Sequence, residues 1–122
     1  MRRQAAKVSI IIPHAKGKEI LRHCLGSLTN TNYLFYEILL VDNGSTDGSR
    51  EMVQDEFPWV RIVETETNLG FAGGCNLGIR ASQSPYVVLL NNDTEVTPNW
   101  LSLLVDAADT DATVGAVQPK VL

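Results

Sequence analysis

Short apolar runs alternate with segments of helical periodicity along the chain, and this alternation is the feature that most constrains the fold. The apolar runs cover residues 8–12, 37–41, 60–63, 86–90 and 114–117. The helical segments cover about 17–29, 45–57, 72–82 and a stretch that follows 97. Continuous apolar strands that alternate with helices indicate a parallel sheet covered on both faces. The sequence therefore predicts an α/β fold with a Rossmann-like, mostly parallel sheet.

Local signals place the helix ends. Ser45, Thr46 and Asp47 are all favourable N-cap residues, so we expect the second helix to begin directly after them. Thr97 is expected to cap the fourth helix, with Pro98 at its first position.

Size and composition indicate one ordinary globular domain. The chain has 122 residues, of which 44% are hydrophobic and 20% charged. No apolar run approaches the ~18 residues of a membrane span, and no signal peptide follows Arg2 and Arg3. We expect a cytoplasmic protein, with peripheral association at the inner face of the membrane left open for a longer parent. Cys24 and Cys75 are expected to be reduced core thiols.

The charge pattern narrows the possible ligands. The formal net charge is −4, and no basic stretch is interleaved with aromatic residues, so nucleic-acid binding is disfavoured. An acidic domain can still bind a phosphorylated ligand through a divalent cation. The segment 45–49 lacks the lysine of a phosphate-binding P-loop, which argues against triphosphate hydrolysis.

Polar residues follow three of the predicted strands. They lie at 13–14, at 42–45 and at 91–93. Ligands of open α/β sheets bind beyond the carboxyl ends of strands, so these side chains are candidates for one site. Asp42 can accept the N3–H of uracil or thymine, or it can form an Asx turn with Gly44. His14 is either a polar lining residue or a solvated loop residue.

The segment 68–78 contains four glycines in and before a helix. Each costs about 1 kcal/mol relative to alanine inside a helix, so close backbone approach must offset that cost. Gly74 and Gly78 share one helix face and can serve either ligand approach or tight packing of the helix on the sheet.

Asp93 follows the fourth predicted strand and is preceded by Asn91 and Asn92. A Mg²⁺ ion in a nucleotide site typically takes only one or two protein carboxylates, and water and phosphate supply its other ligands. Asp93 alone is therefore a sufficient metal ligand, although another Asx turn is the alternative reading.

Together these residues resemble family 2 glycosyltransferases of the GT-A type. Four blocks at this spacing carry the resemblance, namely 8–13, 40–49, 68–78 and 89–94. The Asn91-Asn92-Asp93-Thr94 form is similar to rhamnosyltransferase-like members, and Asn91 replaces the first aspartate of the Asp-x-Asp metal motif. The resemblance implies that the whole chain, 1–122, is a nucleotide-sugar-binding domain and a fragment of a longer glycosyltransferase.

The resemblance also implies roles for individual residues. Asp42 would read the base of a UDP- or dTDP-linked sugar, and Asp93 would hold Mg²⁺ or Mn²⁺ on the diphosphate. The residues expected to line the donor site are Pro13, His14, Asp42, Gly44, Ser45, Asn68, Gly70, Asn76, Asn91 and Asn92.

The expected activity is inverting hexosyl transfer to an acceptor hydroxyl, in polysaccharide biosynthesis. The acceptor, a glycan or a lipid-linked sugar, and the catalytic base are expected to require residues beyond Leu122, so the isolated chain should be inactive. Two alternatives remain at this point. One is a non-catalytic nucleotide-sugar-binding module. The other is a sugar-1-phosphate nucleotidyltransferase, for which 14–18 is a poor basic loop.

Overall fold

Strand β1, Val8–His14, is buried along its entire length. In the computed structural model, which describes residues 7–110, it pairs in parallel with β2, Tyr36–Asn43, on one side and with β4, Tyr86–Leu89, on the other. Strand β3, Arg61–Thr65, pairs in parallel with β2, so the strand order is β3-β2-β1-β4. Strand order reverses beside β1, which makes its carboxyl end a topological switch point.

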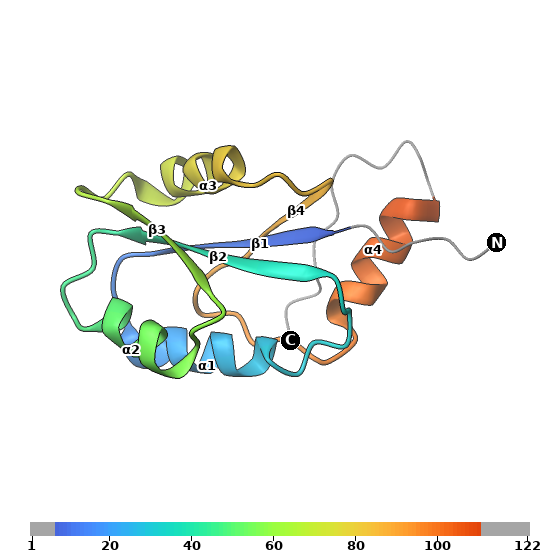
Figure 1. Ribbon diagram of the computed structural model, residues 1–122, viewed down its shortest axis with the longest axis horizontal. Helices are drawn as coiled ribbons and strands as arrows, with labels where there is room; N and C mark the ends of the chain where they lie inside the picture. Colours follow the sequence, from blue (N-terminus) through green and yellow to red (C-terminus); the bar gives the residue numbers. More distant parts are fainter. Residues whose placement is uncertain (1–6, 111–122) are drawn as a thin grey trace.

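Helices cover both faces of this sheet (Figure 1). Helices α1, Lys18–Leu28, and α2, Ser49–Glu56, lie on one face, and α3, Gly70–Ala81, lies on the other. Helix α4, Trp100–Thr110, adds Leu101 to the α1 side of the core. The predicted parallel α/β architecture is confirmed, and the run at 114–117, expected to be a fifth strand, lies outside the described residues.

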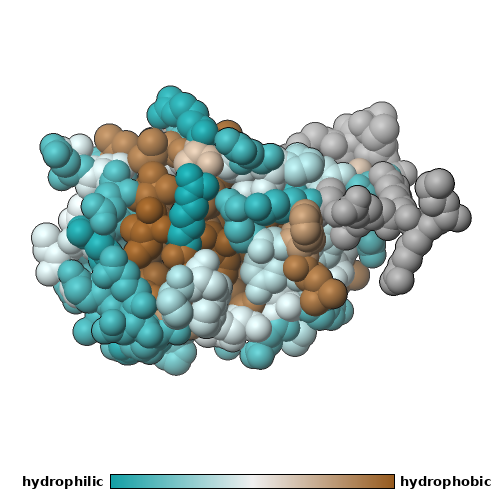
Figure 2. Space-filling view, in the orientation of Figure 1, coloured by the Kyte–Doolittle hydropathy of each residue, from teal (hydrophilic) through white to brown (hydrophobic). Residues whose placement is uncertain are grey.

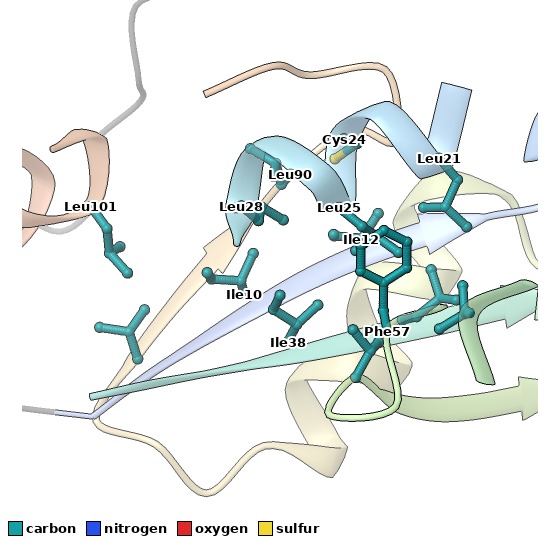
Figure 3. Packing of buried hydrophobic residues seen from close by; sticks show 14 of the residues in the cluster. Ile10, Ile12, Leu21, Cys24, Leu25, Leu28, Ile38, Phe57, Leu90 and Leu101 are labelled. Atoms are coloured by element: carbon teal, nitrogen blue, oxygen red, sulfur yellow. The ribbon is translucent and has the colours of Figure 1, made fainter. Parts of the chain in front are cut away.

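The larger part of the core lies between the sheet and α1. Buried Leu21, Leu25 and Leu28 on α1 pack against Ile10 of β1 and Ile38 of β2 (Figure 3). Full burial of such a side chain stabilises the fold by about 1.5–3 kcal/mol. The alternation of side chains along a strand therefore fixes which face of β1 and β2 receives α1.

The opposite face is closed by α3 at short range. A Cβ on Gly78 would lie 2.4 Å from Cγ2 of Ile11 and 3.2 Å from Cγ2 of Val41. A Cβ on Gly74 would lie 2.8 Å from Nδ2 of Asn43. Of the two readings of this glycine pair, tight packing of the helix on the sheet is the one seen.

The edge strand β3 is less covered than its neighbours. Ile62 and Val63 are half-buried, and neighbouring Trp59 is exposed. Figure 2 shows hydrophobic surface in the region of this edge, surrounded by hydrophilic side chains.

Two helix starts differ from the prediction. Helix α2 begins at Ser49, and its N-cap is Gly48 with φ 84°, not one of the residues at 45–47. Helix α4 begins at Trp100, two residues beyond Pro98, after a turn in which the Trp100 N–H donates to the Thr97 carbonyl. Both preceding loops also bind other parts of the chain, since Asp47 accepts from the Gly17 N–H and the Pro98 carbonyl accepts from the Asn32 N–H.

Both cysteines are free and buried, as expected for core thiols. Burial raises the pKa of Cys24 to about 12, so this thiol is protonated and unreactive at neutral pH.

Candidate functional site

The carboxyl ends of β1, β2 and β4 converge, as the sequence predicts. His14 ends β1 and lies opposite Asp42 in the β1–β2 register. The side chain of Asn92, from the loop after β4, reaches His14 with 2.9 Å between Asn92 Nδ2 and His14 Nδ1. Side chains from three separate strand exits therefore lie within one small region of the sheet edge.

His14 is buried, so it is not the solvated loop residue that was one of its two readings. Its Nε2 lies 2.8 Å from the Ser49 hydroxyl at the start of α2. Burial lowers the pKa of His14 below its ordinary value, although the charges of Asp47 and Asp42 act in the opposite direction. The imidazole is consequently neutral at pH 7, and it joins β1, the start of α2 and the loop after β4.

Asp47 holds two parts of the loop region together. Its Oδ2 accepts from the backbone N–H of Gly17 at 2.9 Å and of Lys18 at 3.1 Å, which caps the start of α1. Its Oδ1 accepts from the hydroxyl and the N–H of Ser49. Burial alone would raise the pKa of Asp47, but these hydrogen bonds and the nearby His14 together lower it to about 2.

Asp42 is buried at the end of β2 with both carboxylate oxygens engaged. Oδ1 accepts from the Ser45 N–H at 2.9 Å, and Oδ2 accepts from Nε of Arg50 at 3.1 Å. Arg50 also lies 3.4 Å from Glu64 on β3. The alternative reading of Asp42, a turn-forming carboxylate, thus describes its contacts in the structure, with the turn closed by Ser45. Each carboxylate oxygen has two lone pairs, so these contacts leave acceptor capacity.

Asn43 connects the end of β2 to the turn before α3. Its Oδ1 accepts from the Leu69 N–H, and its Nδ2 donates to the Gly70 carbonyl, both at 3.3 Å. Asn68 closes the same turn, because its Oδ1 accepts from the Gly70 N–H at 2.8 Å. Gly44 and Gly70 have φ angles of 78° and 74°, a region where a side chain is strained.

The loop after β4 presents Asp93 to solvent. The Thr94 N–H donates to the Asn91 carbonyl at 3.1 Å, which closes a turn around Asn92 and Asp93. Within this turn Asn92 is half-buried, whereas Asn91 and Asp93 are exposed.

The donor set of this turn fits a weakly held hard cation. Among residues 7–110 no three His, Cys, Asp or Glu side chains group as a metal site. One exposed carboxylate beside amide side chains supplies too little charge to hold Mg²⁺ or Mn²⁺ alone, but it suffices where a diphosphate provides further oxygens.

Asn76 is less closely tied to this region than the other predicted residues. It is exposed on α3, and within the described part of the chain no hydrogen bond joins it to the loops at the strand ends. Pro13 is buried near α3, since a Cβ on Gly74 would lie 3.0 Å from its Cβ.

The sequence placed Asn43 only among the polar residues that follow the second strand, and it gave no contact in the site to Asp47, Ser49 or Arg50. Arg50 lies eight residues after Asp42, a spacing that does not predict their contact, and nothing local indicates that Asp47 turns back toward α1. The pairings of Asn43 with Leu69, of Asp47 with Gly17 and of Ser49 with His14 join segments that are far apart in the sequence and meet only once the sheet is assembled.

Comparison with known proteins identifies the family. Residues 9–121 match the family model described as glycosyl transferase family 2, and the chain therefore belongs to this family. In residues 7–110 no helix has both the length and the hydropathy needed to cross a bilayer.

Two curated relatives indicate the range of named activities. The chain is 31% identical to glycosyltransferase GlyG of Streptococcus pneumoniae, over 88% of this chain and 38% of that protein. It is 29% identical to the N-acetylglucosaminyl-diphospho-decaprenol L-rhamnosyltransferase of Mycobacterium tuberculosis, over 92% of this chain and 40% of that protein. The chain thus spans about two fifths of the length of these relatives.

Solved structures share the fold. A mannosyltransferase from Pyrobaculum calidifontis in complex with GDP-Man and Mn²⁺ superposes with a TM-score of 0.83 at 24% identity, covering 92% of this chain and 34% of that one. Residues 1–349 of S. aureus TarS in complex with UDP superpose with a TM-score of 0.76 at 19% identity, covering 93% of this chain and 38% of that one. The fold is therefore the GT-A glycosyltransferase fold.

Proposed function

We propose that this chain binds the donor of a glycosyl transfer, a UDP- or dTDP-linked sugar, at the carboxyl ends of β1, β2 and β4. The observation that carries the proposal is the convergence of polar side chains from these three strand exits at a topological switch point, where ligands of open α/β sheets bind. The structural relatives in complex with UDP and with GDP-Man support a nucleotide donor.

Asp42 is the residue proposed to recognise the base. It is a buried carboxylate at the end of β2, and its free lone pairs can accept the N3–H of uracil or thymine. Adenine has no corresponding ring N–H, whereas guanine has an N1–H, so a guanosine diphosphate should bind less well than UDP but better than ADP. Loss of one charged hydrogen bond of this kind costs about 1.5–3 kcal/mol.

Asp93 is the proposed protein ligand of the cation. Bound with the donor, Mg²⁺ or Mn²⁺ would neutralise charge that develops on the departing nucleoside diphosphate. The exposed position of Asp93 on a turn of the sheet edge allows its carboxylate to face a diphosphate. The structural relative with GDP-Man also contains Mn²⁺.

The complete reaction is proposed for a longer protein. We infer inverting transfer of a hexose or a rhamnose-like sugar to a glycan or lipid-linked acceptor, in polysaccharide biosynthesis. The rhamnosyltransferase named among the relatives supports this class of reaction. A peripheral location at the inner membrane face would bring a cytoplasmic donor site to a lipid-linked acceptor.

The base preference tests this proposal. Calorimetric titration of the chain with UDP, dTDP, GDP and ADP, each with Mn²⁺, should rank the two pyrimidine nucleotides first and ADP last. Asp42→Asn should abolish the preference, because it replaces the charged acceptor. Equal affinities for UDP and ADP in the unsubstituted chain would refute the assignment.

Arg50→Gln is the matched control for that substitution. It breaks the same ion pair, 3.1 Å between Arg50 Nε and Asp42 Oδ2, but leaves the carboxylate in place. It should therefore lower the stability of the loop while preserving the order of nucleotide affinities. Loss of the preference in both variants would mean that the ion pair, not the Asp42 acceptor, sets it.

A further inference from the structure

A continuous network of hydrogen bonds crosses the sheet edge through His14. Asn92, on the turn after β4, donates to His14 Nδ1, and His14 Nε2 contacts Ser49. Ser49 in turn donates to Asp47, which caps α1. This hydrogen-bond network links the turn that carries Asp93 to the loop that follows Asp42. These are the two parts of the proposed donor site.

The contacts at both ends of this hydrogen-bond network independently require the same tautomer of His14. Asn92 Nδ2 also lies 3.3 Å from the backbone carbonyl of Lys16, which can only accept, so this atom is the amide nitrogen and His14 Nδ1 must accept from it. At the other end, the Asp47 carboxylate can only accept from Ser49. The Ser49 oxygen is then the acceptor for an N–H on His14 Nε2.

Histidine is suited to this position by its two ring nitrogens. A neutral imidazole accepts at one nitrogen while it donates at the other, and the two sites are fixed in one rigid ring. The ring is buried beneath the loops, and the charged groups that face it are Asp47 and Asp42. The Asn92 side chain also donates to the Lys16 carbonyl in the loop after β1, and within residues 7–110 it is the His14 ring that joins this side chain to Ser49 at the start of α2.

We propose that His14 is a positioning residue that holds Asn92, and with it the turn that carries Asp93, at a fixed position relative to the loop after β2. The inference rests on the proposed function and deepens it, because it assigns the alignment of the metal-binding turn with the base pocket to one neutral imidazole. Because His14 is 2% exposed and both of its ring nitrogens are engaged, we assign it no direct contact with the donor. Loss of the ring should therefore weaken the metal-dependent part of donor binding and leave the metal-independent part largely unchanged.

Two substitutions divide the two contacts of the ring. His14→Asn places an acceptor oxygen near the former Nδ1 and loses the contact with Ser49. His14→Gln places an amide donor near the former Nε2 and loses the acceptor for Asn92. Both remove the ring and share its packing loss, so the difference between them sets the contact with Asn92 against the contact with Ser49.

The experiment measures UDP affinity with Mn²⁺ and with a chelator for the unsubstituted chain and both variants. In His14→Gln the factor by which Mn²⁺ strengthens UDP affinity should fall about three- to tenfold, the range expected for one hydrogen bond. In His14→Asn most of that factor should be retained. An unchanged gain in His14→Gln, or equal losses in the two variants, would overturn the inference. Absence of UDP binding by the unsubstituted chain would instead refute the proposed function.

A nitrogen NMR measurement judges the positioning role without any nucleotide. The imidazole ¹⁵N shifts of His14 at pH 7 should report a neutral ring protonated at Nε2, and Asn92→Ala should shift the Nδ1 resonance as it loses its donor. Asn92→Ala changes a half-buried turn residue and so provides a folded variant if both His14 variants unfold. It should show the same selective loss of the Mn²⁺ gain. A cationic ring or protonation at Nδ1 in the unsubstituted chain would contradict the inference.

Discussion

The carboxylate of Asp47 accepts a hydrogen bond from the backbone N–H of Gly17 at 2.9 Å, across 30 residues of sequence. The loop after β2 thereby caps the helix that follows β1, and no side chain of α1 caps its own start. The first turn of α1 and the start of α2 are consequently fixed to each other at the edge where the donor is proposed to bind.

Removal of this cap should destabilise the domain. Asp47→Ala leaves the N–H groups of Gly17 and Lys18 without their acceptor, and we expect a loss of about 1–2 kcal/mol in the free energy of unfolding. Urea denaturation followed by circular dichroism measures it. Asp55→Ala, an exposed aspartate of α2, is the control and should change stability by less than about 0.5 kcal/mol. Similar losses in the two variants would show that the cap contributes nothing specific.

Stability should decline as the pH falls below neutrality. The pKa of His14 is lowered on folding from its ordinary 6.5, so the unfolded chain binds more protons in the window just below that value. Stability in this window therefore rises with pH, by at most about 1.4 kcal/mol per pH unit. His14→Gln should flatten the dependence, and His23→Gln, at an exposed position on α1, should retain it. A flat profile for the unsubstituted chain between pH 5 and 6.5 would contradict a buried, neutral His14.

Asp47 contributes a second decline at lower pH. Its pKa is about 2 in the folded chain and 3.8 ordinarily, so its stabilisation is complete above 3.8 and is lost as the pH falls toward 2. The difference in stability between Asp47→Ala and the unsubstituted chain should therefore be smallest near pH 2. Thermal unfolding at a series of pH values measures it. A difference that stays constant down to pH 2 would count against this assignment.

Gly78 is closely surrounded and Gly26 is not, so alanine substitutions at these two positions test the packing of α3 on the sheet. Gly78→Ala introduces a Cβ 2.4 Å from Ile11, on the buried face of the sheet, and should destabilise the domain by about 1–3 kcal/mol. Gly26→Ala, in α1, meets no atom within 4 Å and should stabilise it by up to about 1 kcal/mol, from helix propensity alone. Chemical denaturation of the two variants decides the matter, and the same sign for both changes would refute the packing account.

Much of this arrangement could be predicted from the sequence, because it depends on local periodicity. The apolar runs identify β1 to β4, and the spacing of Gly74 and Gly78 marks a close approach on one face of α3. The parallel layout then brings the polar residues of three strand exits to one edge. The family resemblance and its GT-A fold are confirmed by the comparisons.

The contacts within that edge could not be predicted in the same way. Asp47 is expected locally to cap α2, and it does accept from the Ser49 N–H there, but its other oxygen also caps α1 through the N–H groups of Gly17 and Lys18. The pairing of His14 with Asn92 joins residues 78 apart in sequence. Such pairings depend on the relative placement of loops, about which sequence spacing carries no information.

The isolated chain should bind donor without transferring sugar at a measurable rate. The carboxylates of the proposed donor site have other assigned roles, Asp42 with the base and Asp93 with the cation, and a positioned general base contributes about 10²–10⁴-fold to such reactions. Incubation with UDP- and dTDP-sugars and a panel of acceptors, followed by mass spectrometry, should detect only slow donor hydrolysis. Acceptor-dependent product would mean that a base lies within the 122 residues, and the first to substitute would be Glu95, Asp106, Asp109 and Asp111.

A nucleoside diphosphate and a divalent cation are proposed to bind together at the carboxyl ends of β1, β2 and β4. The most direct test is the affinity for UDP with Mn²⁺ and after chelation, for the unsubstituted chain and for Asp93→Ala. We expect Mn²⁺ to strengthen binding at least about tenfold, or 1.4 kcal/mol, and Asp93→Ala to remove that gain while binding without metal is unchanged. A UDP affinity that does not respond to the chelator, or an Asp93→Ala chain that keeps the full gain, would contradict the account.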